Sequence, residues 1–133
     1  MDIPNNFYRT SIKALILNEE GKFLLCKEEN GMWDLPGGGL DFGESIRDCI
    51  TRELGEENGF KLIKFEVKPV TFTVFKNLKG FWASNVLYKV EVNTDGFTPS
   101  EECLEFRYFN IVEALKENIY PSVIELVKAL NEN

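Results

Sequence analysis

The clearest periodic pattern in the chain lies in residues 44–57, where apolar side chains recur three and four positions apart. Because an α-helix turns by about 100° per residue, this spacing predicts an amphipathic helix. The apolar positions on its packing face are Ile46, Cys49, Ile50 and Leu54. We expect this helix to begin at Glu44 or Ser45, with Ser45 or Asp41 as its amino-terminal cap, and to end at Gly59.

Carboxylates occupy part of the same packing face. Glu53 and Glu57 project onto the face of Ile46 and Ile50, and Glu56 lies at its edge. Side chains three and four positions apart are roughly 5–6 Å from each other, so each pair repels by about 3 kcal/mol at an effective dielectric constant near 20. A hard divalent cation such as Mg²⁺, which prefers oxygen ligands and meets phosphates, would offset this repulsion. The ordinary alternative is a solvated acidic helix end.

The rest of the chain reads mostly as strands separated by turns. Gly37–Gly39 fits neither a helix nor a strand interior, and we expect a loop that leads into the helix. Further strands are predicted at residues 8–17, 22–27, 32–35, 60–75 (one or two strands, broken near Pro69), 81–92 and 106–109, and helices at 111–118 and 121–131. The order predicts an α/β fold in which a mixed sheet lies between helices, as one domain over residues 1–133.

The charge balance narrows the range of partners. The chain of 133 residues has 15 basic and 22 acidic side chains, a formal net charge of −7. Such a charge opposes non-specific binding to nucleic acid or to an anionic membrane. A polyphosphate substrate would also be repelled unless a bound metal reversed the local sign of charge.

The residue types exclude several catalytic classes. The chain contains no histidine, which excludes Ser-His-Asp and Cys-His nucleophilic sites and zinc sites built on histidine. Its three cysteines, Cys26, Cys49 and Cys103, are expected to be small buried hydrophobic residues in a reducing compartment. The segment from Met1 to Asn6 lacks the pattern of a secretory signal, and no apolar run approaches the length of a membrane span. A cytoplasmic location is therefore expected.

The 23 residues from Gly38 to Phe60, GGLDFGESIRDCITRELGEENGF, carry the most specific signal. They resemble, without a gap, the signature box of the Nudix hydrolases, G-x5-E-x7-R-E-U-x-E-E-x-G-U, in which U is a bulky apolar residue. Leu54 and Phe60 fill the two U positions, and the preceding WDLPGGG is similar to the family's approach to the box. The resemblance implies an αβα sandwich.

The resemblance also implies roles for individual residues. In the family, the carboxylates of the box hold one or more divalent ions against a diphosphate. Glu56 and Glu57 are the best candidates for metal ligands, and Glu53 is either a ligand or the base that deprotonates water. A further ligand is expected from residues 100–105, with Glu102 preferred over Glu101 and Glu105. Mg²⁺ is the implied ion, with Mn²⁺ as a substitute.

Other residues of the box and of the first strands are candidates for supporting roles. Arg52 would orient the carboxylates or contact phosphate, and Glu44 would brace the loop. The amides of Gly37, Gly38 and Gly39 could support phosphate oxygens. Lys27 and Arg9 could receive phosphate charge, although a surface role is the commoner one for each. Four aromatic residues could stack on a base: Trp33, Phe72, Phe75 and Trp82.

The implied reaction is metal-dependent hydrolysis of a nucleoside diphosphate linked to another group X, which gives a nucleoside monophosphate and phosphorylated X. Position 76 is Lys, where ADP-ribose hydrolases usually carry Pro, and no Tyr lies nearby as in many dinucleoside polyphosphate hydrolases. These absences favour a MutT-like hydrolase of nucleoside triphosphates or nucleotide sugars. The alternatives are a non-catalytic nucleotide sensor and an enzyme that processes RNA ends, and a homodimer is one assembly state that the sequence leaves open.

Overall fold

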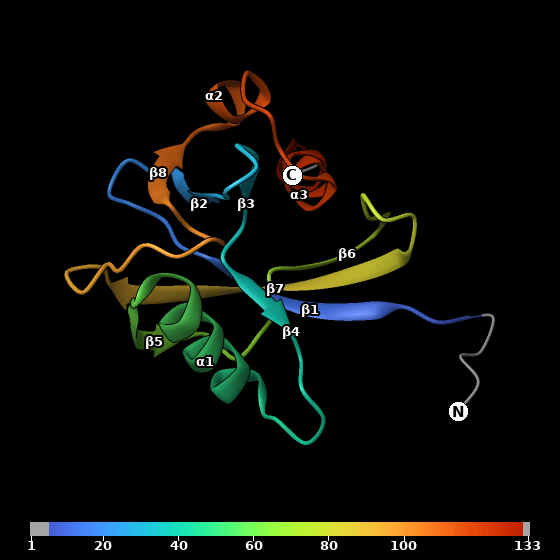
Figure 1. Cartoon of the computed structure of the whole chain (residues 1–133), viewed down its shortest axis with the longest axis horizontal. Helices are drawn as coiled ribbons and strands as arrows, with labels where there is room; N and C mark the ends of the chain where they lie inside the picture. Colours follow the sequence, from blue (N-terminus) through green and yellow to red (C-terminus); the bar gives the residue numbers. More distant parts are fainter. Residues whose placement is uncertain (1–5, 132–133) are drawn as a thin grey trace.

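A computed structural model describes residues 6–131. Residues 1–5 and 132–133 lie outside the described residues, and with them most of the segment in which a secretory signal was sought. Two sheets and three helices form the fold (Figure 1). The strands are β1 (Arg9–Leu15), β2 (Phe23–Lys27), β3 (Trp33–Asp34), β4 (Gly37–Gly39), β5 (Lys61–Phe65), β6 (Thr71–Lys76), β7 (Trp82–Asn93) and β8 (Glu105–Phe109), and the helices are α1 (Ile46–Asn58), α2 (Ile111–Leu115) and α3 (Pro121–Asn131).

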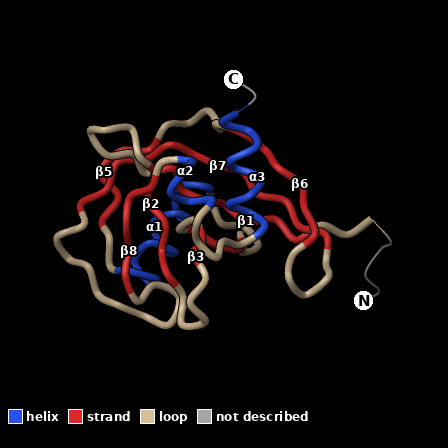
Figure 2. Tube along the Cα trace, turned by 90° about the horizontal axis from the view of Figure 1, so that it is seen from above, coloured by secondary structure: helices blue, strands red, loops and turns tan. Residues whose placement is uncertain are grey.

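The larger sheet is mixed, as predicted. Its order is β4-β1-β7-β5, with β6 also paired to β7; β1 and β7 run parallel, and the other pairs are antiparallel. The smaller sheet, in the order β3-β2-β8, is antiparallel. Helix α1 packs against β1, β4 and β5 on one face of the larger sheet, and α3 packs against β6 on the other, so the helices enclose the sheet (Figure 1). Figure 2 shows α3 lying across the sheet beside β6.

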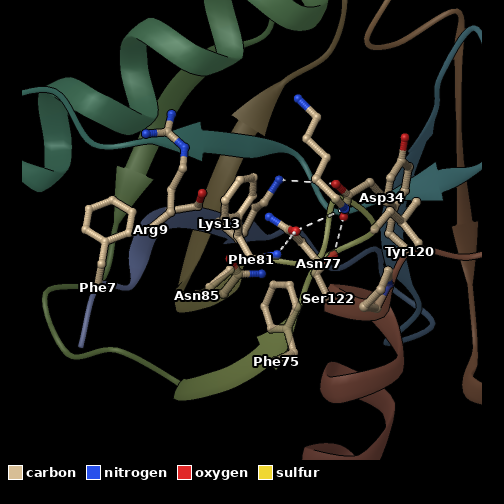
Figure 3. A pocket seen from close by; sticks show the side chains of 15 residues that line it. Phe7, Arg9, Lys13, Asp34, Phe75, Asn77, Phe81, Asn85, Tyr120 and Ser122 are labelled. Atoms are coloured by element: carbon tan, nitrogen blue, oxygen red, sulfur yellow. Dashed lines mark hydrogen bonds and ion pairs between the residues drawn. The ribbon is translucent and has the colours of Figure 1, made fainter. Parts of the chain in front are cut away.

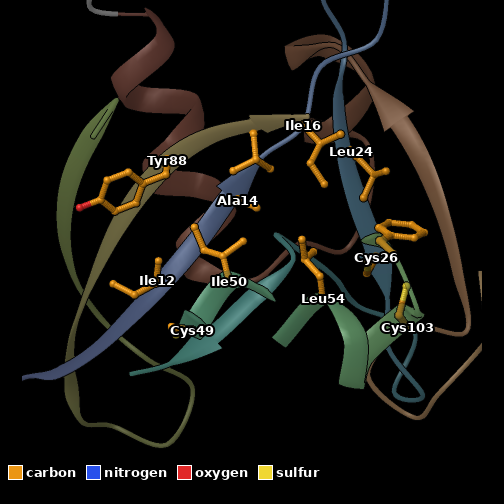
Figure 4. Close-up of a cluster of buried hydrophobic side chains, with 12 residues drawn as sticks. Ile12, Ala14, Ile16, Leu24, Cys26, Cys49, Ile50, Leu54, Tyr88 and Cys103 are labelled. Carbon is orange, nitrogen blue, oxygen red and sulfur yellow. The ribbon is translucent and has the colours of Figure 1, made fainter. Parts of the chain in front are cut away.

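Two hydrophobic clusters hold these layers together. The first lies between α1 and the larger sheet, where Ile12 and Ala14 of β1 meet Ile50 and Leu54 of α1 (Figure 4). The second lies under α3, where Leu126 joins residues of both sheets. All three cysteines are buried and free, as expected. Among residues 6–131, no helix is both long enough and apolar enough to cross a membrane.

Most of the predicted elements are present with shifted ends. The predicted helix at 111–118 ends at Leu115, while the one at 121–131 has the predicted bounds. The stretch 60–75 forms two strands, with Pro69 in the break between them. The predicted loop at Gly37–Gly39 is wrong, because these residues form strand β4 against β1. Gly37 has φ +116°, and a side chain there would collide with the backbone of Ile12, so glycine is what allows this strand to lie so close.

Candidate active site

Helix α1 fixes the register of the acidic residues through both of its ends. Ser45 is the amino-terminal cap, and its side-chain oxygen accepts a hydrogen bond from the Asp48 amide at 3.1 Å. Gly59 ends the helix in the left-handed conformation at φ 73°, and its amide donates to the Leu54 carbonyl at 3.0 Å. This register turns the carboxylates of Glu53 and Glu57 toward β4.

Three carboxylates meet beside the carboxyl-terminal half of α1. Oxygen atoms of Glu53, Glu57 and Glu102 all lie within 4.8 Å of one another. Glu53 is 9% exposed and Glu57 is 6% exposed, whereas Glu102 lies at the surface. The acidic group, as we call these three residues, contains two of the three box glutamates predicted to hold metal and the preferred ligand from outside the box.

Hydrogen bonds from the loop between β7 and β8 bring Glu102 to this position. The Ser100 hydroxyl donates to the Glu57 carbonyl oxygen at 2.5 Å, and the Thr98 amide donates to the Asn58 carbonyl at 2.9 Å. Two backbone hydrogen bonds between Ser100 and the buried Cys103 then close a tight turn that carries Glu102. The loop is therefore fastened to the end of α1 just before the turn that carries Glu102.

The Glu57 carboxylate is buried against β4 and β1. Its Oε1 accepts a hydrogen bond from the Gly37 amide at 2.8 Å. Burial raises the pKa of Glu57 well above its ordinary value, although the Lys13 ammonium and the Gly37 amide oppose this. Burial also raises the pKa of Glu53, against the effect of Arg52. The raised pKa values mean that the ionised forms of Glu53 and Glu57 are disfavoured in the protein alone, and a bound cation would stabilise them.

Arg52 joins the box carboxylates into one network. Its Nε and Nη2 donate to the two carboxylate oxygens of Glu44 at 2.8 and 3.0 Å, and its Nη1 donates to Glu53 Oε1 at 2.9 Å. Nη2 also donates to the Gly39 carbonyl, and Nη1 to Glu56 Oε2 at 3.3 Å. The hydrogen bond from Arg52 lowers the pKa of Glu44 to about 2. These contacts fit the role predicted for Arg52, which is to orient the carboxylates, and the role predicted for Glu44, which is to brace the loop. Both roles stay predictions.

Glu56 lies outside the acidic group. Its side chain is 61% exposed, and its carboxylate is paired with Arg52 at the outer side of the helix. The predicted ligands Glu101 and Glu105 are not part of the acidic group either.

Gly38 faces the acidic group directly. A Cβ atom added to Gly38 would lie 2.6 Å from the Glu53 carboxylate, so any side chain there would displace Glu53. A Cβ atom added to Gly39 would likewise collide with the guanidinium of Arg9. The glycines are thus needed for close approach of the helix and of β1 to β4.

The two cations predicted to receive phosphate have different surroundings. Arg9 lies beside Gly39, and no carboxylate among residues 6–131 pairs with it. Lys27 lies in the smaller sheet, where its Nζ is 3.7 Å from Glu105 Oε1 and 5.9 Å from the centre of the Trp33 ring. No hydrogen bond or ion pair joins Lys27 to the acidic group, so the structure brings Arg9 but not Lys27 close to the box.

A cavity of about 500 Å³ opens on the α3 side of the larger sheet, next to β4 (Figure 3). Arg9, Lys13, Asp34 and Asn85 are among its polar lining residues, and Phe75 is among its aromatic ones. Other predicted stacking residues lie elsewhere: Trp33 is buried against Phe109, and Phe72 and Trp82 are exposed.

Lys13 connects the cavity with the acidic group. Its Nζ donates to the Gly37 carbonyl at 3.2 Å, and the Gly37 amide donates to the Glu57 carboxylate. Burial by itself would lower the pKa of Lys13, but the carboxylates of Asp34 and Glu57 outweigh it and the pKa is raised. Sequence reasoning missed Lys13, Asp34 and Asn85, although a lysine between Ile12 and Ala14 in a strand signals a polar position on the opposite face.

The donor set fits a hard divalent cation. The acidic group offers only carboxylate oxygens, which suit Mg²⁺ or Mn²⁺ better than softer metals. The chain is therefore an α/β protein with a candidate metal site, which is formed by carboxylates beside a helix that has glycines before and after it. The chain belongs to the Nudix hydrolase family, because the NUDIX domain family matches residues 7–130.

Individual relatives agree with this assignment. A nucleoside triphosphatase NudI from Escherichia fergusonii is 44% identical in an alignment of 71 residues that covers 49% of this chain and 50% of that protein. The chain thus spans about half the length of the curated relatives it matches. The crystal structure of a MutT protein from Methanosarcina mazei Go1 superposes with a TM-score of 0.75 at 26% identity, over 98% of this chain and 97% of that one. The Escherichia coli ORF135 protein has a TM-score of 0.76 at 23% identity, over 94% and 89% of the two chains, and shares the fold.

Proposed function

We propose that this chain hydrolyses nucleoside diphosphates linked to a group X, with a nucleoside triphosphate or a nucleotide sugar as substrate and a divalent cation as cofactor. The products are a nucleoside monophosphate and phosphorylated X. The observation that carries the proposal is the acidic group, in which three carboxylates, two of them buried, lie within 4.8 Å of one another. The name of the NudI relatives supports a nucleoside triphosphate as the first substrate to test.

Glu53, Glu57 and Glu102 would hold the cation, with Mg²⁺ as the natural ion and Mn²⁺ as its substitute. When bound, such an ion lowers the pKa of water and neutralises charge on phosphate oxygens. Arg52 holds Glu53 Oε1, so that the other oxygen of Glu53 is free to face the ion. Glu53 is then either a ligand of the ion or the base that deprotonates the attacking water, and Glu56, paired with the same guanidinium, stays a prediction from the sequence as a further ligand.

The cationic residues beside β4 would receive the substrate's phosphates. Arg9 faces Gly39 without a carboxylate partner among the described residues, and we assign it to a phosphate oxygen. The amides of Gly38 and Gly39 are candidates for the same role. Lys27 remains a prediction from the sequence.

A panel of nucleoside triphosphates, nucleotide sugars, dinucleotides and a 5′-triphosphorylated RNA, incubated with Mg²⁺ and with every product identified, tests the proposal. We expect a nucleoside monophosphate from at least one mononucleotide. Glu102→Gln should lower that turnover at least tenfold, and Glu101→Gln, its exposed neighbour, should leave it near the wild-type rate. Nucleotide binding without any product would instead indicate a sensor, and cleavage of RNA alone would indicate processing of RNA ends.

A further inference from the structure

Helix α1 covers only part of one face of the larger sheet. It packs against β1, β4 and β5, whereas β6, the start of β7 and the start of β1 extend past it (Figure 1). Beyond the helix, Thr10, Ser84 and Val74 are paired in register across β1, β7 and β6, so their side chains point to one face. Ile12 and Val86, two positions further along the same strands, pack in the cluster under α1. This row therefore lies on the α1 face, in the part that the helix leaves open.

Large apolar side chains are exposed on this open part of the face. Trp82 and Phe72, each two positions from a member of the row, are 51% and 62% exposed. The Tyr8 ring lies 6.4 Å from the Trp82 ring between centroids. Phe42, from the loop between β4 and α1, is fully exposed and lines the same hollow as Tyr8. The apolar patch, as we call it, consists of Tyr8, Phe42, Phe72, Val74 and Trp82.

The apolar patch is large for the surface of a protein that stays monomeric. An aromatic side chain has about 150–250 Å² of surface to bury, so the exposed fractions of these five residues amount to about 600 Å². The largest apolar patch on a typical monomer covers about 300–600 Å². Two copies that covered each other's patch would bury about 1,200 Å² in total, which is the lower end of the range for specific protein interfaces.

The charged residues at the two ends of the apolar patch make the surface complementary to itself. Lys76 is exposed at the β6 end, where it is paired in register with Trp82. Asp41 precedes Phe42 at the β4 end, and its side chain is 71% exposed, with one oxygen 3.5 Å from Arg52 Nη2. Strands β1 and β7 lie between these two ends. A two-fold axis through the patch would therefore bring the lysine of each copy to the aspartate of the other.

We propose that the apolar patch is the interface of a homodimer, in which two copies of this chain face each other around a two-fold axis with Lys76 of each copy beside Asp41 of the other. An anionic membrane fits this surface less well, because the net charge of −7 opposes it. A second copy supplies the matching charges by symmetry. The surface is separate from the acidic group and from the cavity under α3, so the inference goes beyond the proposed function and does not depend on it.

Sedimentation of the full chain over a range of concentrations tests the interface. We expect the mass to rise from 15.3 kDa to twice that value, with a dissociation constant in the micromolar range, since the buried area is small. Phe72→Glu and Trp82→Glu should each weaken the dimer by about tenfold or more. Val112→Glu is the matched control, because Val112 of α2 is also 62% exposed but lies outside the patch. This variant should dimerise like the wild type.

Exchange of the two end charges tests the two-fold arrangement itself. Lys76→Glu places two acids at each contact and Asp41→Lys two bases, so each variant alone should dimerise about tenfold more weakly than the wild type. An equimolar mixture of the two variants should regain the wild-type affinity, because both contacts then join opposite charges. An unrelated partner protein would not produce this rescue.

Thermal unfolding at low concentration, where monomers dominate, separates a lost interface from a lost fold. Because the replaced side chains are exposed in the single chain, each variant should unfold close to the wild-type Tm. A wild type that stays monomeric at high concentration overturns the inference, whether or not it sediments with anionic vesicles. A dimer that survives both patch variants, or a mixture that stays as weak as its components, also overturns it. None of these measurements involves nucleotide turnover, so the proposed function stands or fails separately.

Discussion

Because Glu57 belongs to the acidic group, we expect its charge to destabilise the folded protein without metal and to stabilise the folded protein once a cation binds. At 4.8 Å and an effective dielectric constant near 20, two ionised carboxylates repel by about 3.5 kcal/mol. Glu57 has two such neighbours, and its burial, which the Lys13 ammonium and the Gly37 amide only partly offset, further disfavours its charged form. We therefore expect Glu57→Gln to stabilise the metal-free protein at pH 8 by about 1–2 kcal/mol, or roughly 3–8 °C in Tm. The glutamine oxygen can still accept from the Gly37 amide.

Added Mg²⁺ should raise the Tm of the wild type and have little effect on the Tm of Glu57→Gln. A ligand at one hundred times its Kd stabilises the folded state by about 2.7 kcal/mol, which corresponds to roughly 8 °C in a chain of this size. The wild type should show this shift and Glu57→Gln should lose most of it, together with its activity. The assay is thermal unfolding in EDTA and in increasing Mg²⁺. Glu101→Gln, which removes an exposed charge beside Glu102, should behave as the wild type in both conditions.

The pH dependence follows from the same carboxylate. Because burial raises the pKa of Glu57 in the folded state, the folded protein binds more protons than the unfolded chain above the ordinary pKa of about 4.5. The contribution of Glu57 to stability is therefore fully present below that value and is lost as the pH rises through the raised pKa. Without metal, the wild type should lose stability over this range more steeply than Glu57→Gln. A destabilised Glu57→Gln protein that keeps the full Mg²⁺ shift would refute the reasoning.

Two other changes test the surroundings of the acidic group. Gly38→Ala should reduce kcat at least tenfold, because its Cβ would lie 2.6 Å from the Glu53 carboxylate. The control is Gly55→Ala, where a Cβ meets nothing within 4 Å. This variant should keep activity and gain about 1 kcal/mol of stability in the same unfolding assay. Glu56→Gln should lower turnover by orders of magnitude with little change in Tm, since the side chain is exposed; wild-type activity in this variant, assayed in Mg²⁺ or Mn²⁺, would remove Glu56 from the mechanism.

The elements that could be predicted well are those whose ends are decided by neighbouring residues. Ser45 and Gly59 set the bounds of α1 through a cap and a left-handed turn, and Pro121 begins α3 at the predicted residue. Strand β4 could not be predicted in this way. Its glycines form a strand because β1 and α1 approach too closely for side chains, and this crowding exists only in the folded protein.

In the candidate site too, some residues could be predicted from local sequence patterns and others are brought together only by the fold. The helical period placed Glu53 and Glu57 on the buried face and Glu56 at its edge, which agrees with their observed exposure. Lys13 and Asn85 could not be found from local patterns. They meet at one cavity because β1 and β7 run side by side and parallel, with Lys13 opposite Leu87 and Ser11 opposite Asn85, although more than 70 residues separate the partners along the chain.

The Gly37 peptide explains why a buried lysine lies beside a site that is proposed to bind a cation. Lys13 offsets part of the charge of Glu57 through space and holds the Gly37 carbonyl, while the Gly37 amide fixes the Glu57 oxygen. The ammonium donates to Asp34, to the Leu35 carbonyl and to Gly37, so it is held on the cavity side of β4 and does not enter the acidic group. One lysine thereby keeps Glu57 oriented without competing for the oxygens that we assign to the metal.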